Sequence, residues 1–240
     1  MPPPTTMTSA MTPPPPHTCR LPVCIVLAGS SVKVDTGEAH GTLAKRSAKD
    51  AEATRRRILA AALELFATTG YSGTSTTAVA RAAGVTRGAL YHHFADKAAL
   101  FRAVFLELEE ELDEAANGAA LARAGEGVLA AFLAGCSACL DFMSRPDYHQ
   151  VAMVDAPAVL GSAAWHEIDA GIGMKTMQAG LGALDAGGLL RGPPSPALAV
   201  LVFGALTEAG ITLSRADDGS PTKAELLGAL VGLLTNQPAT

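Results

Sequence analysis

Two short helical patterns, separated by a tight turn at Gly84, lie in the second quarter of the chain. Thr74 and Thr86 precede the two segments and are good N-cap residues. We therefore predict short helices over 75–82 and 87–93. The side chains expected to face inward are Ala78, Val79, Ala82, Leu90 and Phe94. Two helices joined in this way are typical of a helix-turn-helix, in which the second helix enters the major groove of DNA.

Longer apolar patterns flank this pair of helices. The first ends at Gly70, predicts a helix over about 51–69 and consists of Ile58, Leu59, Ala62, Leu63, Leu65 and Phe66. The second follows a potential cap at Asp96, predicts a helix over about 97–116 and consists of Leu100, Phe101, Val104, Phe105, Leu108 and Leu112. The acidic run at 109–111 is expected to form a solvated face of this second helix.

The rest of the chain also predicts helices alone. Helical spacing covers about 126–144, 147–155, 163–186, 196–215 and 222–235, with Pro or Gly clusters between most of these segments. No stretch shows the period-two alternation of a half-buried strand. The expected fold class is therefore all-α, with an N-terminal three-helix domain and a C-terminal helical domain.

The net charge of −5 conceals a division along the chain. Residues 1–43 have no net charge, residues 44–102 carry ten Lys and Arg against four Asp and Glu, and residues 103–240 carry six against seventeen. A basic segment beside an acidic one suggests an electropositive surface for a polyanion and a different role for the remainder. We therefore divide the chain into an extension (1–43), a basic domain (44–102) and an acidic domain (103–240).

The extension at 1–43 is rich in Pro, Ser, Thr and Gly and is expected to be disordered. Part of it loosely imitates a signal peptide with a short apolar core, and translation from a non-Met start codon near Val32 or Val34 is a further hypothesis. No apolar window free of Gly, Asp or Arg is long enough for a membrane helix. Because four cysteines are too sparse for a disulfide scaffold, we expect a cytoplasmic protein.

The run from Arg57 to Phe105 resembles the DNA-binding domain of the TetR family of bacterial transcriptional repressors. The similarity lies in Ile58–Phe66, Gly70–Tyr71, Thr74–Ser75, Val79–Ala80, Ala83–Thr86, Gly88–Phe94, Lys97 and Leu100–Phe101. The remainder resembles the family in helix count and in segments such as Asp155–Leu160 and Phe203–Ala209. The resemblance implies that 44–102 binds a double-stranded DNA operator, and that 103–240 binds a small-molecule effector and forms a homodimer. We expect no cofactor and no metal.

Candidate DNA contacts come from both short helices. Thr86 caps the second helix, so its backbone amides can face a phosphate. Arg87 has the guanidinium fork suited to guanine, and the small Gly88 and Ala89 allow close approach to the groove. The resemblance adds groove, backbone or phosphate contacts for Thr76, Thr77, Tyr91, His92, His93 and Lys97.

Alternative roles stay open for several of these residues. Tyr91 could instead be a half-buried packing residue of its own domain. The arginines at 55–57 could follow the DNA backbone or only keep their helix soluble. His92 and His93 are adjacent on a helix and point about 100° apart, so they are poorly placed to share a metal ion.

Sulfur-containing and aromatic side chains of the acidic domain could line an apolar pocket or simply form core. They are Leu140, Met143, Met153, Trp165, Met174, Met177 and Phe203. Glu208 and Asp169 fall on largely apolar segments and could anchor a ligand, or could be capped or solvent-facing carboxylates. Cys136 and Cys139 are i, i+3 neighbours and could be core residues or a thiol sensor. Because cationic groups are few, the expected effector is mostly apolar.

The expected function is a ligand-responsive repressor that binds a palindromic operator as a homodimer. The resemblance implies dimer faces on the last two helices, formed by Gly204, Ala205, Ala209, Leu226, Leu227, Leu230, Val231 and Leu234. A thiol-sensing regulator and a structural DNA-binding protein without a ligand are the alternatives. An enzyme lacks support, because the sequence has no Ser/His/Asp or Cys/His signature and no Gly-rich phosphate loop.

Overall fold

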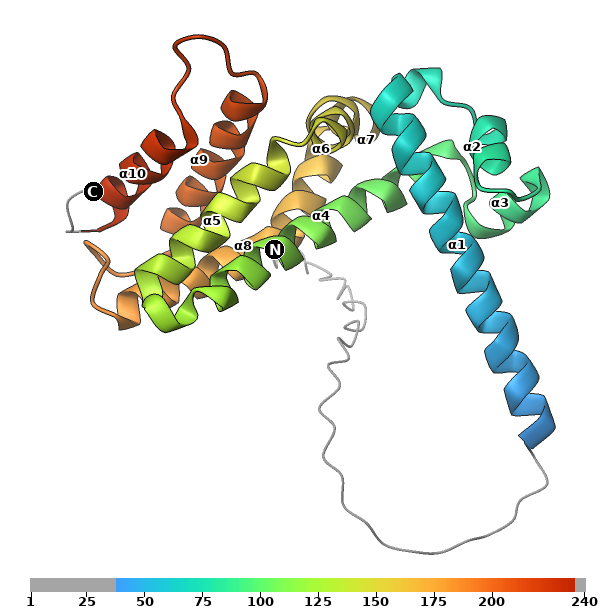
Figure 1. Ribbon diagram of the computed structural model, residues 1–240, viewed down its shortest axis with the longest axis horizontal. Coiled ribbons are helices and arrows are strands. Elements are labelled where there is room, and N and C mark those ends of the chain that lie inside the picture. Colours follow the sequence, from blue (N-terminus) through green and yellow to red (C-terminus); the bar gives the residue numbers. More distant parts are fainter. Residues whose placement is uncertain (1–37, 236–240) are drawn as a thin grey trace, which may run out of the picture. The chain divides into compact units, whose positions relative to one another are not determined.

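Helices make up the regular structure of the chain (Figure 1). The structure, a computed structural model, describes the backbone of residues 38–235 and the side chains of residues 49–235. Within this range no β-strand occurs, and an isolated antiparallel bridge joins Leu190 and Thr235. The all-α prediction is confirmed. The predicted disorder of the extension lies outside the described residues as far as residue 37, whereas residues 38–43 are helical.

Four helices form the N-terminal part of this structure: α1 (Glu38–Gly73), α2 (Thr76–Ala82), α3 (Arg87–His93) and α4 (Lys97–Ala122). The start of α1 at Glu38 corrects the prediction of residue 51. Residues 44–57 are rich in Ala, Lys, Arg and Glu, which are strong helix formers, so the helix continues there without an apolar stripe. Gly70, with a φ of 70°, kinks α1 near its predicted end.

The caps of the short helices are largely those that the sequence predicts. Thr86 and Asp96 cap α3 and α4, each accepting a hydrogen bond from the backbone nitrogen three residues later, at 3.1 and 2.7 Å. The cap of α2 is Ser75, however, and the prediction of Thr74 is wrong. Thr74 is buried, and its hydroxyl donates to the carbonyl oxygen of Gly70 at 2.8 Å, so it closes the kinked end of α1.

The C-terminal part consists of a 3-10 turn η1 (Ala124–Glu126), α5 (Val128–Met143), α6 (Pro146–Tyr148), a π-helix η2 (His149–Asp155), α7 (Ala156–Leu160), α8 (Ser162–Ala186), α9 (Pro196–Ser214) and α10 (Lys223–Leu234). Four of its predicted helices agree with these bounds to within two residues. The fifth, over 147–155, is mostly π-helix. A π-helix has one extra residue in its turn, a feature that apolar spacing does not reveal.

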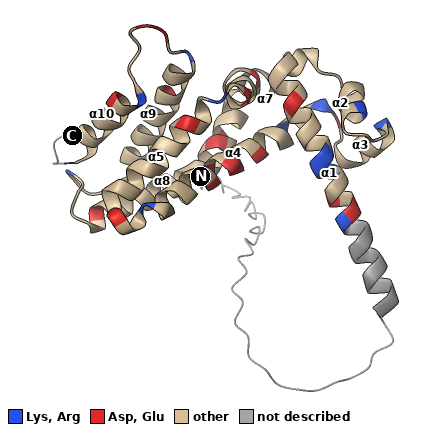
Figure 2. Cartoon of the chain, in the orientation of Figure 1, with Lys and Arg blue, Asp and Glu red and all other residues tan. Residues whose placement is uncertain are grey.

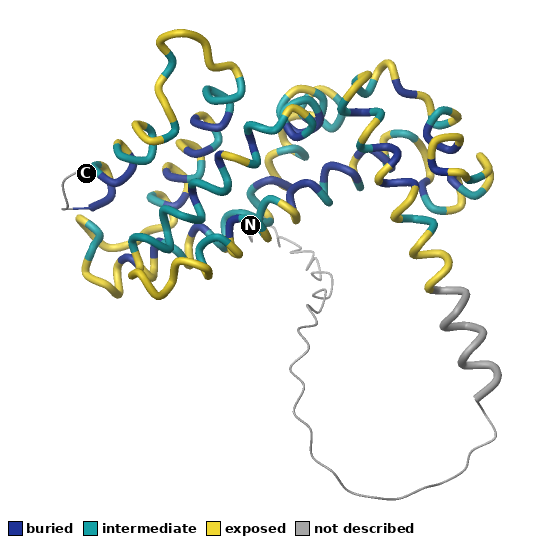
Figure 3. The backbone as a smooth tube through the Cα atoms, viewed as in Figure 1, coloured by how far each residue is buried: buried dark blue, intermediate teal, exposed yellow. Residues whose placement is uncertain are grey.

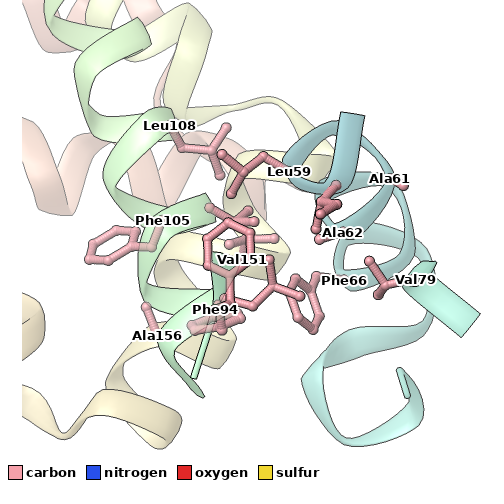
Figure 4. Packing of buried hydrophobic residues seen from close by; sticks show 14 of the residues in the cluster. Leu59, Ala61, Ala62, Phe66, Val79, Phe94, Phe105, Leu108, Val151 and Ala156 are labelled. Atoms are coloured by element: carbon pink, nitrogen blue, oxygen red, sulfur yellow. The ribbon is translucent and has the colours of Figure 1, made fainter. Parts of the chain in front are cut away.

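Two clusters of buried apolar side chains hold the helices together. The first joins α1 to α4 with α6, η2 and α7, and Figure 4 shows Phe66, Phe105 and Val151 from three of these elements within it. The second joins α5, α8, α9 and α10. Ala82 is exposed, which corrects its assignment to the inner face of α2, because the buried positions of that helix and its end are Val79, Ala80 and Ala83.

α4 belongs to both parts of the fold. Residues 44–240 form one unit, and the predicted domain boundary at 102/103 falls within α4. Leu100 and Phe101, near its start, are buried in the first cluster against the helix-turn-helix. Its later turns pack against α5 and α8. A continuous helix of this kind can pass a displacement from one part to the other.

One described helix, α9, is long and apolar enough by composition to cross a membrane, with a mean hydropathy of 1.8. A second candidate arises only if α5 and the bent segment Pro146–Leu160 are counted together. On sequence alone, α9 is excluded as a membrane helix because its segment contains glycines. This finding is weak evidence for a membrane span, because core helices of soluble proteins pass the same test.

Candidate DNA interface and ligand cavity

α3 divides its residues between the core and the surface. Leu90 and Phe94, at its end, are buried in the first cluster, as predicted. Arg87, Tyr91 and His92 are exposed, and Figure 3 shows exposed stretches along α2 and α3. Gly88 is also exposed, and Ala89 and His93 are half-buried. Of the α3 residues that the sequence proposes for DNA contact, four are therefore accessible and two are partly so.

Tyr91 is held by residues of both short helices. Its hydroxyl oxygen lies 3.1 Å from Oγ1 of Thr76 on α2, and the guanidinium carbon of Arg87 lies 5.6 Å from the centre of its ring. The hydrogen bond with Thr76, followed by that with Arg87, lowers the pKa of the Tyr91 hydroxyl. The ring is thus packed against its neighbours and yet 41% exposed, so the two sequence interpretations of Tyr91 are compatible. Thr77 is exposed on the same helix as Thr76.

The basic side chains of this region differ in the contacts that they make within the protein. Figure 2 shows Lys and Arg on α1, α2 and α3, with acidic residues along α4. Lys97 places its ammonium 4.1 Å from the centre of the Tyr71 ring, and Arg55 pairs with Glu107 at 3.4 Å. Both cationic side chains therefore already interact with other residues of the protein. Arg87 has no carboxylate partner among the described residues, and its guanidinium lies over the exposed Tyr91 ring.

A cavity of about 410 Å³ is lined mainly by residues of α4, α5, α8 and α9. Three of the eight residues proposed for a pocket line it: Met143, Met177 and Phe203. The other five lie elsewhere. Leu140 and Met174 belong to the second cluster, Met153 and Trp165 pack on the first, and Glu208 is exposed on α9. The remaining lining is mostly small or apolar and includes Ala116, Phe132, Gly135, Gly173 and Gly180.

Three carboxylic acids interrupt this apolar lining: Glu109, Asp113 and Asp169. Glu109 is only 3% exposed, so its assignment to a solvated face is wrong. The spacing that could have revealed this is present, because Glu109 lies four residues after Phe105 and three before Leu112 on the apolar stripe. Its Oε1 accepts a hydrogen bond of 2.8 Å from the Tyr148 hydroxyl.

The burial of two of these acids changes their protonation. Desolvation, with a further contribution from the charge of Asp169, raises the pKa of Glu109 to about 8. Desolvation also raises the pKa of Asp169 to about 6. A buried carboxyl group ionises reluctantly because it loses the hydration of its charge. Titratable groups perturbed in this way inside a cavity are frequent at functional sites.

Comparison with known proteins identifies the family. Residues 58–104 match the family model "Bacterial regulatory proteins, tetR family", and residues 129–236 match "Tetracyclin repressor-like, C-terminal domain". A solved TetR-family transcriptional regulator from Pectobacterium atrosepticum is 32% identical, with a TM-score of 0.64, over 79% of this chain and 98% of that one. The chain belongs to the TetR family.

Curated relatives match over the helix-turn-helix part of this TetR-family protein. The HTH-type transcriptional regulator AcrR of Shigella flexneri is 44% identical over 72 residues, which are 30% of this chain and 34% of that protein. The regulator SrpR of Pseudomonas putida is 44% identical over 71 residues, which are 30% and 33%. The match thus spans about a third of the length of these relatives. It supports DNA binding and transcription regulation as the function of this family member.

Cys136 and Cys139 of this TetR-family protein both line the cavity. Burial raises the pKa of each thiol to about 12. Thiol oxidation proceeds through the thiolate, which is scarce at neutral pH when the pKa is that high. The geometry therefore favours core residues over a thiol sensor.

A hydrogen bond joins the helix-turn-helix to the C-terminal part. The backbone nitrogen of Tyr71 donates to Oδ2 of Asp155 at 2.8 Å, just after the kink of α1. Asp155 is the last residue of the π-helix, whose first residue follows Tyr148 directly. Because Tyr148 lines the cavity, a single short segment connects the cavity wall to the end of α1.

Arg87→Ala is expected to weaken operator binding and to remove base preference at one symmetric pair of positions. A bidentate contact from arginine to guanine contributes about 1–3 kcal/mol of discrimination. Measured affinities for a set of single-base operator variants test this, with Arg123→Ala at the far end of α4 as the control. Equal losses for operator and random DNA would show that Arg87 contacts only the backbone, and base reading would then pass to Thr77, Ala89 or His92.

Proposed function

We propose that this TetR-family protein is a cytoplasmic, ligand-responsive repressor that binds a palindromic operator as a homodimer. The observation that carries the proposal is the pairing of an accessible helix-turn-helix surface with a separate internal cavity in one packed unit. The first part provides DNA recognition, and the second provides space for a small molecule. Continuous elements connect the two.

The DNA-binding part of the proposal rests on the exposed face of α2 and α3. Its proposed contacts are Thr76, Thr77, Thr86, Arg87, Gly88, Ala89, Tyr91, His92, His93 and Lys97. The cap at Thr86 leaves the first backbone amides of α3 near the surface, where a phosphate can accept from them. Tyr91 and Arg87 are held against one another, which reduces the conformational entropy lost on binding.

The dimer part of the proposal rests on apolar side chains left uncovered on α9 and α10. Val200, Leu201 and Leu233 are exposed, and Gly204 and Ala205 are exposed beside them. Other residues assigned to the dimer faces instead belong to the protomer's own core: Ala209, Leu230, Val231 and Leu234 are buried. The proposed interface is therefore the outer face of α9 with Leu233. A two-fold axis there would present two α3 helices to successive major grooves.

The response to a ligand would pass through α4 and the π-helix. Both contribute to the first cluster with the helix-turn-helix, and α4 also lines the cavity. A ligand that displaces α4 or Tyr148 would shift α1 through the Asp155 hydrogen bond and change the separation of the two α3 helices. The coupling is reciprocal, so operator DNA must weaken ligand binding by the same factor.

Protection of a DNA operator from nuclease digestion tests the proposal. We expect a short inverted repeat to be protected, with one dimer as the minimal binding unit. Coating of DNA without sequence preference would instead indicate a structural DNA-binding protein. Thermal melting against a compound library provides the second arm, because a ligand-responsive regulator should show a stabilising compound and a structural protein should show none.

A further inference from the structure

The charged side chains that line the cavity are all acidic. Among its lining residues are three carboxylic acids, and no Lys, Arg or His lies in the described wall. The rest of the wall is apolar or carries small hydroxyl and amide groups. An anionic ligand would find no cationic side chain to pair with there. A purely apolar ligand would leave the buried acids without compensation, which is unfavourable.

The three acids differ in how far the protein satisfies them. Asp113 accepts hydrogen bonds from Thr176 at 2.6 Å and from Asn117 at 3.0 Å. Glu109 accepts one from Tyr148. Asp169 is 8% exposed, lines the cavity, and makes no hydrogen bond or ion pair with any described side chain. Its oxygens are not among the fully enclosed unpaired atoms of the described residues, so a partner that enters the cavity can reach them.

That partner has an apolar body. The rings of Phe132 and Phe203 lie so close to α8 that a Cβ at Gly180 or Gly173 would come within 2.9 and 2.7 Å of them. The two glycines therefore allow aromatic rings to line the cavity. The described residues also contain no group of three or more side chains able to hold a metal ion. Aromatic faces attract organic cations such as quaternary ammonium groups.

We propose that the cavity binds an amphipathic organic cation, with its charged nitrogen against Glu109 and Asp169 and its apolar body against Phe132 and Phe203. This inference rests on the proposed ligand-responsive function and adds the chemical class of the ligand. It also gives the unsatisfied Asp169 its partner. The cation supplies the positive charge that the wall lacks. Its apolar part leaves water and packs against the two aromatic rings.

Cation binding should be coupled to the protonation of Glu109. The titratable groups that act on it are Asp169 on α8, Tyr148 on α6 and Cys139 on α5, and Asp169 in turn feels the charge of His166 on its own helix. Because the pKa of Glu109 is raised to about 8, the empty site holds a proton at neutral pH. A bound cation favours the carboxylate, so binding releases that proton. Cation affinity should therefore rise with pH up to about 8.

Calorimetry with three probes of the same chain length tests the inference on the full chain. Decyltrimethylammonium carries a permanent positive charge, decanol is neutral and decanoate is anionic. We expect the cation to bind at least about tenfold more tightly than the other two, each used below its micelle concentration. Titrations in two buffers of different ionisation enthalpy should show close to one proton released per cation at pH 7. Decanol binding should show no pH dependence.

Variants separate the two carboxyl groups from general effects of charge. Glu109→Gln and Asp169→Asn should each lower cation affinity by about tenfold or more and leave decanol affinity unchanged. Glu109→Gln should also remove proton release. Glu110→Gln is the matched control, because Glu110 is the exposed neighbour of Glu109 on α4. Equal losses in the control would contradict the inference.

Two results would overturn the cation assignment in distinguishable ways. If decanol binds as tightly as the cation and no proton is released, the cation class is wrong, and the proposed repressor with an apolar effector stands. If none of the probes binds, the cation assignment is again wrong. Protection of an inverted repeat by the same preparation then decides whether the repressor function survives without a ligand in this cavity.

Discussion

Leu201→Glu is expected to abolish dimerisation and, with it, operator binding. Leu201 is 71% exposed on α9, next to Val200 at 58% and opposite Leu233 at 73% on α10. At a two-fold interface the substitution introduces two unpaired charges into an apolar contact, and each buried charge is strongly unfavourable. Operator affinity should fall by about a hundredfold or more, because a monomer reaches one half-site alone.

Sedimentation velocity measures the loss of the dimer, and a DNA mobility shift measures the loss of operator affinity. The matched control is Leu121→Glu on α4, where the leucine is 78% exposed and lies outside the proposed interface. Because Leu201 is not part of either core cluster, the monomer should keep its helical content. A Leu201→Glu variant that remains dimeric would exclude this face of α9.

Glu109→Gln is expected to stabilise the empty protein at pH 8 and to have little effect at pH 5. The pKa of Glu109 is about 8 in the folded protein against an ordinary value of 4.5. Between these two values the folded state keeps a proton that the unfolded state has released. The free energy of unfolding therefore falls as the pH rises, by about 1.4 kcal/mol per pH unit.

Integrated from pH 5 to pH 8, this effect is on the order of 4 kcal/mol for Glu109. Asp169 acts in the same direction at lower pH, because its pKa is raised from 3.8 to about 6. A glutamine at 109 cannot ionise, and its amide oxygen can still accept from Tyr148. Urea unfolding at both pH values tests the difference, with Glu110→Gln as the control. An equal effect of Glu109→Gln at pH 5 and pH 8 would show that Glu109 ionises normally.

The loss of stability caused by the buried Glu109 suggests that this residue has a role other than folding. A buried acid that destabilises the folded state above pH 5 could be replaced by an apolar residue with benefit to stability alone. A carboxyl group in a cavity whose pKa is strongly perturbed is a candidate for a functional site.

Much of the helical fold was available from the sequence, because its signals are local. Helix caps act over three residues, so Thr86 and Asp96 could be placed directly. Apolar spacing also identified the buried side chains of α4, from Leu100 to Leu108. The resemblance then assigned the helix-turn-helix to a family, and the comparisons confirm that assignment.

Local signals fail where two neighbouring residues are equally good helix caps. They also fail where a helix depends on helix-forming residues rather than on an apolar stripe. Thr74 and Ser75 are both good caps, and only the kink at Gly70 decides that Thr74 turns inward to close α1. The long start of α1 has helix-forming residues without an apolar stripe, so periodicity placed its beginning too late.

The candidate ligand site depended on the tertiary structure. Sequence could nominate Met and aromatic residues, but whether a side chain lines a cavity or fills a core depends on which helices meet it. Met177 and Met174 are three residues apart on α8, and only Met177 reaches the cavity. Glu109 became a buried acid because Tyr148, 39 residues further along the chain, packs against it. The sequence determined helix positions through local backbone chemistry, whereas the cavity and its charge arise from contacts between distant segments that local patterns do not encode.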